Sequence, residues 1–336
     1  MDRLKKDLKD KRLVIIVGVG VTLNATTDAS GKTLPRLTWT GLIRNGLDYL
    51  VSAGYAQASN RRIRYAYEAL DDSDPAILLD AAGIMADQMR KNGQFPTWLE
   101  SVFGSLHEEV RNRSLLEVLR ALHREGATLL TTNYDDLLER ACDLRRVGRS
   151  NQDDILKFKR GDLDGVFHVH GSYHDPHEVV LDNTQYYQVT HADEVQNVLQ
   201  TFLEYKTIIF VGCGSGLEDP NFGALLKWAS ERHGNISNKH CLLVRDADNL
   251  NHKMLVRLKY GPDYSDLAHY LQCLLDEPFE PPQDSMPSRT GKQAEHPAAF
   301  LNSTRIKSFL RRLGPFRNGK EIADRILGCS RSLQFH

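Results

Sequence analysis

The chain has 336 residues, enough for one large domain or two ordinary ones. Its 43 Lys and Arg residues nearly balance its 44 Asp and Glu residues, and the net charge of −1 predicts no nucleic-acid or anionic-membrane partner. The longest apolar run, from Leu13 to Val21, is too short to span a bilayer. The charged segment Met1–Arg12 lacks the apolar core of a signal peptide, so we expect a cytoplasmic or nuclear location.

The five cysteines predict neither a zinc module nor a disulfide framework. No two of them form a CxxC pair, and their odd number and wide spacing are typical of reduced, mostly buried thiols. We therefore expect no bound metal. The cysteines are Cys142, Cys213, Cys241, Cys273 and Cys329.

The first predicted strand, Leu13–Val17, runs into Gly18-x-Gly20. Glycines at a strand end let the backbone approach a pyrophosphate, and the hydroxyl of Thr22 is placed to bind a phosphate. The dinucleotide fingerprint is incomplete, because Leu23 stands at its third glycine. A phosphate-binding turn and a plain tight turn are both compatible with this segment.

Residues 39–126 predict a lobe of several helices over the nucleotide site, broken near Asn60, Asp74 and Pro96. The last helix of the lobe carries an apparent capping box, Ser114-x-x-Glu117. Beyond Gly126, strands and helices alternate. Strands are predicted near 127–131, 165–169, 207–212 and 240–244, and helices are predicted over an apolar stripe at 195–203 and from Asp219 to Glu231. The fold class predicted is α/β, a Rossmann-like parallel sheet with a helical lobe inserted after the first strand.

Polar residues follow three of the later strands, where open α/β sheets place their ligands. Thr131-Thr132-Asn133-Tyr134-Asp135 ends the second strand, and Asn133 or Asp135 is also suited to cap the next helix. His168 and His170 end the next strand. Strand alternation predicts that they point to opposite faces, so that one of them faces the site, and glycine at 171 leaves room for a ligand beside His170.

The fourth strand also ends in a glycine-rich turn. Gly212, Gly214 and Ser215 are placed to contact a ribose or an adenine, and Asp219 before Pro220 is either part of that site or an ordinary helix start. Residues 277–299 hold five prolines, and a basic stretch follows from Arg305 to Lys320. This composition predicts a catalytic domain over 1–276 and a linker with a basic tail over 277–336.

Together these motifs resemble the SIR2-like family of NAD-consuming enzymes. Gly18–Thr22 takes the place of the GAGxS loop, Thr131–Asp135 that of TTNYD, His170-Gly171 that of the catalytic His-Gly, and Gly212–Asn221 that of the GxGxxDxN segment. Residues 239–245 and 260–271 are similar to the closing strand and final helix of the family. Two features of protein-deacylating sirtuins are absent from the sequence, the GIPDFR continuation and the four-cysteine zinc module.

The resemblance implies a zinc-free NAD⁺ glycohydrolase of an immune or stress-defence system that acts by NAD depletion, with NAD⁺ as substrate. It implies that Asn133 positions the nicotinamide ribose and a water and that His170 accepts a proton. It also implies that Tyr134 and Asp135 hold the carboxamide, that the glycine loops with Thr22 and Thr132 bind the rest of the nucleotide, and that the enzyme forms a homo-oligomer or filament. A protein deacylase, an ADP-ribosyltransferase, and an NAD or ADP-ribose sensor with little turnover are the alternatives.

Overall fold

The computed structural model describes the chain except residues 29, 73, 191–192, 215–239, 249–254 and 277–336. The contacts divide the chain into two units, Met1–Pro281 and Pro282–His336, and the described residues belong to the first. The predicted helix from Asp219 to Glu231 and the predicted tail lie outside the described residues. No helix among the described residues is both long and apolar enough to cross a bilayer.

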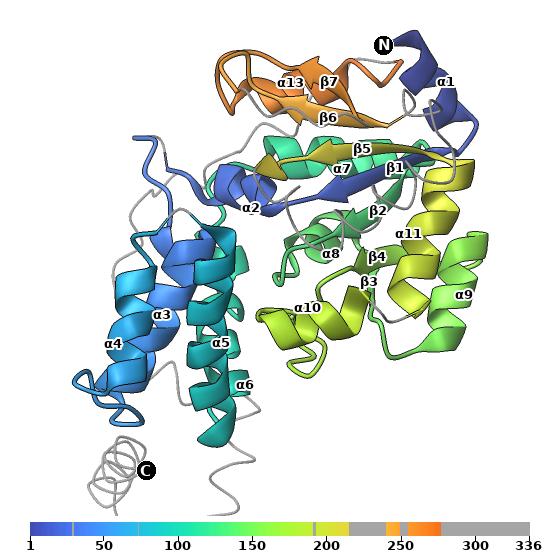
Figure 1. Ribbon diagram of the computed structural model, residues 1–336. Coiled ribbons are helices and arrows are strands. Elements are labelled where there is room, and N and C mark those ends of the chain that lie inside the picture. Colours follow the sequence, from blue (N-terminus) through green and yellow to red (C-terminus); the bar gives the residue numbers. More distant parts are fainter. Residues whose placement is uncertain (29, 73, 191–192, 215–239, 249–254, 277–336) are drawn as a thin grey trace, which may run out of the picture. The chain divides into compact units, whose positions relative to one another are not determined.

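The first unit is built on a seven-stranded sheet in the order β3-β4-β2-β1-β5-β6-β7, in which every paired strand runs parallel (Figure 1). The strands are β1 (Leu13–Val17), β2 (Thr128–Thr131), β3 (Arg145–Val147), β4 (Gly165–His168), β5 (Thr207–Val211), β6 (Cys241–Val244) and β7 (Val256–Lys259). This confirms the predicted Rossmann-like α/β class and the four strands predicted after Gly126.

Helices cover both faces of the sheet, as a parallel sheet of apolar strands requires. Leu13, Ile15 and Val17 of β1 belong to the core shared with α1, α7 and α13, whereas Val14 and Ile16 belong to the core shared with α9 and α11. The covering helices are α1 (Asp2–Lys9), α7 (Ser114–Arg124), α8 (Leu137–Cys142), α9 (Gln152–Arg160), α10 (Asn183–Thr190), α11 (Asp193–Tyr205) and α13 (Asp266–Gln272). The apolar stripe predicted at 195–203 is therefore core.

The segment between β1 and β2 is helical, as predicted, and α3 to α6 form a group of helices beside the sheet (Figure 1). Asn60 and Asp74 are the N-caps of α4 and α5, and their side chains accept hydrogen bonds from the backbone N–H groups of Arg62 and Ala76. The helices of this segment are α2 (Val19–Thr26), α3 (Trp39–Ser52), α4 (Arg61–Ala69), α5 (Pro75–Lys91) and α6 (Phe95–Phe103), with 3₁₀ turns η1 (Pro35–Leu37) and η2 (Leu106–Glu109).

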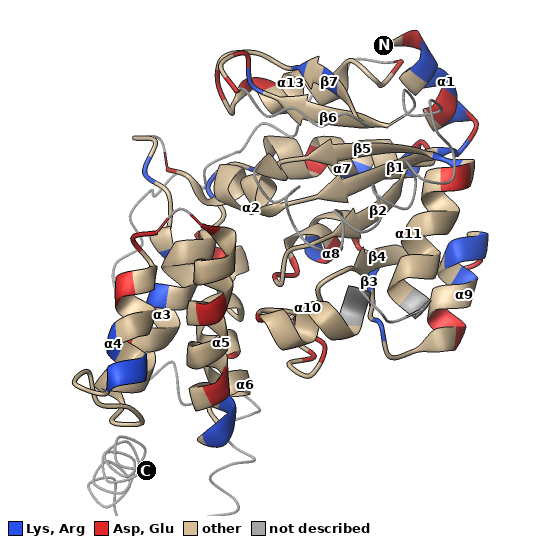
Figure 2. Cartoon of the chain, in the orientation of Figure 1, with Lys and Arg blue, Asp and Glu red and all other residues tan. Residues whose placement is uncertain are grey.

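Each of the helices α1, α4, α5 and α9 carries both basic and acidic residues (Figure 2). These helices therefore present mixed surfaces, in keeping with the near-zero net charge.

The capping box predicted at Ser114 is wrong. The N-cap of α7 is Arg113, Ser114 is the first helical residue, and the side chain of Asn112 accepts from the N–H of Ser114 at 3.0 Å. The acceptor side chain thus stands two residues earlier than the sequence pattern indicates.

Trp98 anchors the helical group. Its side chain is fully buried, its Nε1 donates to Oδ1 of Asn45 at 2.9 Å, and its ring lies 5.7 Å from that of Phe95. We expect Trp98→Ala to lower the free energy of unfolding by about 3–5 kcal/mol, because it leaves a large cavity and an unpaired amide. Urea unfolding measures this loss. Trp98→Phe, which fills most of the space, should cost much less, and equal losses in the two variants would contradict the packing argument.

Candidate functional site

The carboxyl ends of four neighbouring strands lie at one level of the sheet. Val17 of β1 is in register with Thr131 of β2 on one side and with Val211 of β5 on the other, and Thr131 is in register with His168 of β4. The four loops that follow therefore leave the sheet side by side. The strand order also reverses at β1, which is where open α/β sheets form their ligand crevice.

The glycines after β1 and β5 pack against each other. The N–H of Gly20 donates to the carbonyl of Gly212 at 2.8 Å, and a Cβ on Gly18 would lie 2.7 Å from the Cα of Cys213. Gly212 has φ +66°, in the left-handed region that favours glycine. Of the two interpretations open for Gly18 and Gly20, the structure shows close backbone packing at both.

Two further features of these loops bear on ligand binding, the start of α2 at Gly18 and the open space beside Gly214. Gly18 is the N-cap of α2, so the positive end of this helix dipole lies at the carboxyl end of β1. Gly214 has φ +50°, and no atom lies within 4 Å of the place where its Cβ would be. Among the glycines of these two loops that the structure describes, it is the one with open space beside it. Ser215 and Asp219 lie outside the described residues.

Thr22, Asn133 and Asp135 form a chain of hydrogen bonds between the first and second loops, in which Thr22 and Asp135 are buried and Asn133 is half-buried. Nδ2 of Asn133 donates to Oγ1 of Thr22 at 2.9 Å and to the carbonyl of Gly18 at 3.2 Å. The hydroxyl of Thr22 in turn donates to Oδ2 of Asp135 at 2.6 Å. Because the carbonyl of Gly18 only accepts, these contacts fix which end of the Asn133 amide is Nδ2. The amide oxygen of Asn133 is therefore turned away from both partners.

The N-cap of α8 is Asp136, and the side chain of its neighbour Asp135 also binds the start of this helix. Oδ1 of Asp135 accepts from the N–H of Leu137, the first residue of α8, at 3.1 Å, as one of the two sequence interpretations predicts. Burial raises the pKa of Asp135 to about 6, although the hydrogen bonds from Thr22 and Leu137 act in the opposite direction. The carboxyl thus titrates within the range where enzymes are commonly assayed.

The threonines of the second loop attach it to β1. The N–H of Thr132 donates to the carbonyl of Val17 at 3.0 Å, and Oγ1 of Thr131 donates to the same oxygen at 3.2 Å. Oγ1 of Thr131 also accepts from the N–H of Asn133 at 3.0 Å, which shapes the turn that carries Asn133.

Tyr134 points into the protein. Its side chain is 8% exposed, its hydroxyl donates to the carbonyl of Val180 at 2.6 Å, and its ring lies against that of Phe103. This placement ties the second loop to the segment before α10.

His170 lies just beyond β4, which ends at His168. The ring of His170 lies edge-on to that of Tyr186 on α10, with centroids 5.6 Å apart, and its side chain is buried. Gly171 has φ +77°, and a Cβ there would lie 2.3 Å from the carbonyl oxygen of Glu178. The expected room for a ligand at Gly171 is therefore wrong, because the backbone of Glu178 fills it.

The sequence interpretation gave His168 no role and did not single out its partner Glu139. Strand alternation does not apply to His168 and His170, because His170 stands after the strand has ended. His168 is fully buried, and its Nε2 lies 2.5 Å from Oε1 of Glu139. Burial alone would lower the pKa of His168, but the Glu139 carboxylate and the carbonyl of Gly171 outweigh it and raise the pKa.

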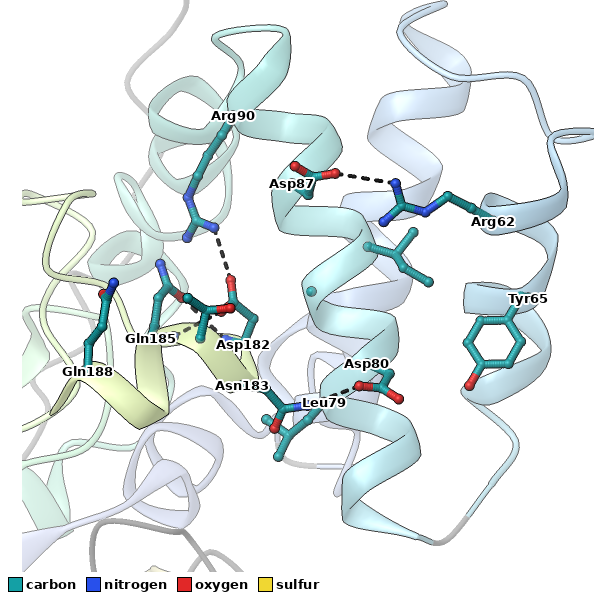
Figure 3. A pocket seen from close by; sticks show the side chains of 13 residues that line it. Arg62, Tyr65, Leu79, Asp80, Asp87, Arg90, Asp182, Asn183, Gln185 and Gln188 are labelled. Atoms are coloured by element: carbon teal, nitrogen blue, oxygen red, sulfur yellow. Dashed lines mark hydrogen bonds and ion pairs between the residues drawn. The ribbon is translucent and has the colours of Figure 1, made fainter. Parts of the chain in front are cut away.

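A separate cavity of about 680 Å³ lies between α4, α5 and α10, and Figure 3 shows its lining side chains. Arg90 pairs there with Asp182 at 3.0 Å, and Arg62 with Asp87 at 3.5 Å. Each arginine of the lining is thus paired with a carboxylate. No residue of the Thr22–Asn133–Asp135 chain lines this cavity.

Among the described residues, no group of three or more His, Cys, Asp or Glu side chains is arranged to hold a metal ion. In the same part of the chain Cys142, Cys213 and Cys241 are buried, and Cys273 is exposed.

Residues 127–264 match the family model described as a SIR2-like domain. The match begins just before β2 and includes both the Thr131–Asp135 loop and His170-Gly171. The resemblance inferred from these motifs is thereby confirmed.

Proposed function

We propose that this chain, a member of the SIR2-like superfamily, is an NAD⁺ hydrolase that releases nicotinamide and ADP-ribose or a cyclic product. The observation that carries the proposal is the hydrogen-bonded chain from Asp135 through Thr22 to Asn133, set beside the loop that carries His170. Both lie at the strand ends where the order of the sheet reverses, the usual place of a nucleotide in this class of fold.

The reaction breaks the bond between the nicotinamide nitrogen and C1′ of the ribose. The bonding electrons leave with nicotinamide, positive charge develops at C1′ as in glycoside hydrolysis, and the oxygen of a water bonds to that carbon. Asn133 presents its amide oxygen to a ribose hydroxyl or to this water, because its Nδ2 is held by Thr22 and Gly18. His170 accepts the proton that the water or the hydroxyl gives up.

We propose structural roles for Thr22 and Tyr134, which the sequence interpretation assigned to ligand binding. The hydroxyl of Thr22 is used by Asp135 and Asn133, so we propose that Thr22 positions Asn133 rather than binding a phosphate. The hydroxyl of Tyr134 is used by Val180, so we propose that Tyr134 holds the loop. Asp135, Thr132 and Gly214 remain proposed contacts of the nucleotide, as do the loops at Gly18, Gly20 and Gly212.

Nicotinamide release from NAD⁺ by the purified protein, with and without an acetylated peptide, tests the proposal. Release that does not depend on the peptide supports the hydrolase, whereas strict dependence on the peptide would identify a deacylase. Transfer of ADP-ribose to added protein would identify a transferase. NAD⁺ binding without release would favour a sensor and contradict the hydrolase.

We expect NAD⁺ cleavage to be independent of added or removed zinc. The cysteine spacing in the sequence supports this expectation, since zinc modules of deacylases need paired cysteines. Rates with EDTA, and after zinc is added back, measure it. Activity that EDTA removes and zinc restores would contradict the expectation.

A defence role by NAD depletion and restraint by self-assembly complete the proposal. A freely active NAD⁺ hydrolase would drain its host cell of NAD⁺, so we propose that the separate chains have little activity and become active when they assemble. Specific activity should therefore rise with protein concentration. Charge reversal at Arg311 and Arg312, which lie outside the described residues, tests whether the basic stretch takes part. Light scattering and nicotinamide release across a dilution series compare the variant with the wild type, and activity independent of concentration would contradict the assembly role.

A further inference from the structure

His168 lies between the two loops that carry the proposed catalytic side chains. Its Nδ1 is 3.1 Å from the carbonyl oxygen of Asn133 and 3.2 Å from that of Gly171. Carbonyl oxygens only accept hydrogen bonds, so Nδ1 carries a proton and shares it between the two. One ring nitrogen thus joins the backbone of the Asn133 loop to the backbone of the His170 loop.

The other side of the ring is anchored to a third element. Nε2 of His168 contacts the carboxylate of Glu139 at 2.5 Å, and Glu139 lies in the first turn of α8. A carboxylate is stabilised near a helix N-terminus by the helix dipole. Because α8 follows the Asn133 loop directly, the contact between His168 and Glu139 links β4 to α8 and to that loop. Both side chains are buried, so this contact is protected from solvent screening.

A second contact between the two loops lies nearby and is made by backbone. The N–H of Tyr173 donates to the carbonyl of Tyr134 at 2.9 Å. The loops therefore have a connection that survives when His168 is changed. Loss of the imidazole should loosen the spacing of the loops rather than separate them.

We propose that His168 is a positioning residue whose Nδ1–H fixes the carbonyls of Asn133 and Gly171, and with them the side chains of Asn133 and His170, relative to one another. The proposal deepens the function proposed above and rests on it. The expected effect on the rate comes from the geometry of the two side chains, because a misplacement of about 1 Å can cost about 10²-fold in rate. His168 itself does not contact the substrate in this scheme.

Two double variants separate the role of Nδ1 from the rest of the side chain. In His168→Asn/Glu139→Gln the amide nitrogen stands near the former Nδ1, whereas in His168→Gln/Glu139→Gln it stands near the former Nε2. Both variants lack the buried charges and differ little in volume. We expect the Asn form to keep kcat within about tenfold of the wild type and the Gln form to lose about 10²-fold, with little change in KM.

Hydrogen exchange supplies a readout that does not depend on activity. Amides of segments 131–136 and 169–174 should exchange faster in the Gln form than in the Asn form, because only the Gln form lacks the shared donor. If the wild type releases no nicotinamide, the proposed hydrolase fails, while the exchange comparison still decides the positioning role. Equal kcat and equal exchange in the two double variants would overturn the proposal.

Glu139→Gln alone covers the case in which the Gln form does not fold. This variant keeps the imidazole and its Nδ1–H, so we expect a folded protein with kcat within about tenfold of the wild type and unchanged exchange in both segments. A folded Glu139→Gln protein that loses about 10²-fold in kcat without faster exchange would show that the carboxylate, not the Nδ1–H, is required, and would likewise overturn the proposal.

Discussion

His170→Ala and Asn133→Ala are each expected to reduce kcat for nicotinamide release by about 10²–10⁴-fold, the usual cost of losing a general base or its positioned partner. The two residues follow adjacent strands, β4 and β2, whose ends are in register at His168 and Thr131. In the proposed mechanism, His170 supplies the proton acceptor, and Asn133 supplies the amide oxygen that orients the hydroxyl or water. Rates under saturating NAD⁺ measure the loss.

The matched control is His269→Ala. His269 is an exposed histidine of α13, so its variant should keep wild-type kcat and show that losing any histidine is not enough. The side chain of His170 is buried against Tyr186, so a lower rate counts as evidence only in a folded protein. Circular dichroism and thermal unfolding of all three variants are therefore compared with those of the wild type. Wild-type kcat in a well-folded His170→Ala protein would contradict the assignment of the base.

The strands that carry the site were predictable because their residues are apolar and end at glycine or polar residues. Leu13–Val17 and Thr207–Val211 are fully buried β1 and β5, and such runs leave few alternatives. The edge strands were not predictable. Arg145–Val147 and Val256–Lys259 are short and charged, which is how edge strands avoid pairing with other chains, and they carry no apolar run.

The loops were predictable in place but not in detail. The motifs put Asn133, Asp135 and His170 at strand ends, yet a sequence does not say which groups fill the space beside a glycine. The space beside Gly171 is filled by the backbone of Glu178, a residue seven positions away, and the space beside Gly20 is filled by the backbone of Gly212. The contact between His168 and Glu139 likewise joins residues 29 positions apart. Only the folded chain brings these partners together.

The second large effect that we expect is a loss of activity below about pH 6, controlled by Asp135. Burial raises the pKa of this carboxyl to about 6, so it becomes protonated as the pH falls through that value. The ionised form accepts the proton of Thr22, which frees Oγ1 of Thr22 to accept from Asn133. A carboxyl protonated at Oδ2 donates to Thr22 instead, so the Thr22 hydroxyl must turn and no longer holds the Asn133 amide as firmly, although the bond from Asn133 to Gly18 remains. The value of kcat/KM should therefore fall by at least about tenfold per pH unit well below this pKa, because the proposed base must be unprotonated as well.

Asp135→Asn tests this dependence because it removes the titrating group while keeping the size of the side chain. The variant should have a lower rate and a shallower acid limb than the wild type, because the contribution of Asp135 is gone and only protonation of the proposed base still removes activity. Asp154→Asn on α9, which removes a carboxylate paired with Arg145, should keep both the rate and the acid limb. An unchanged acid limb in the Asp135→Asn variant would assign the titration to another group.

The titration of Asp135 can also be followed without substrate, through the pH dependence of thermal stability. A folded-state pKa above the unfolded value means that the stability from this group is fully present below the unfolded pKa, about 3.9, and is lost as the pH rises through about 6. The amide of Asp135→Asn does not ionise and escapes that loss. The difference in Tm between the variant and the wild type should therefore move in favour of the variant from pH 5 to pH 8. A Tm difference that stays constant over this range would contradict a raised pKa for Asp135, and with it the origin that we assign to the acid limb.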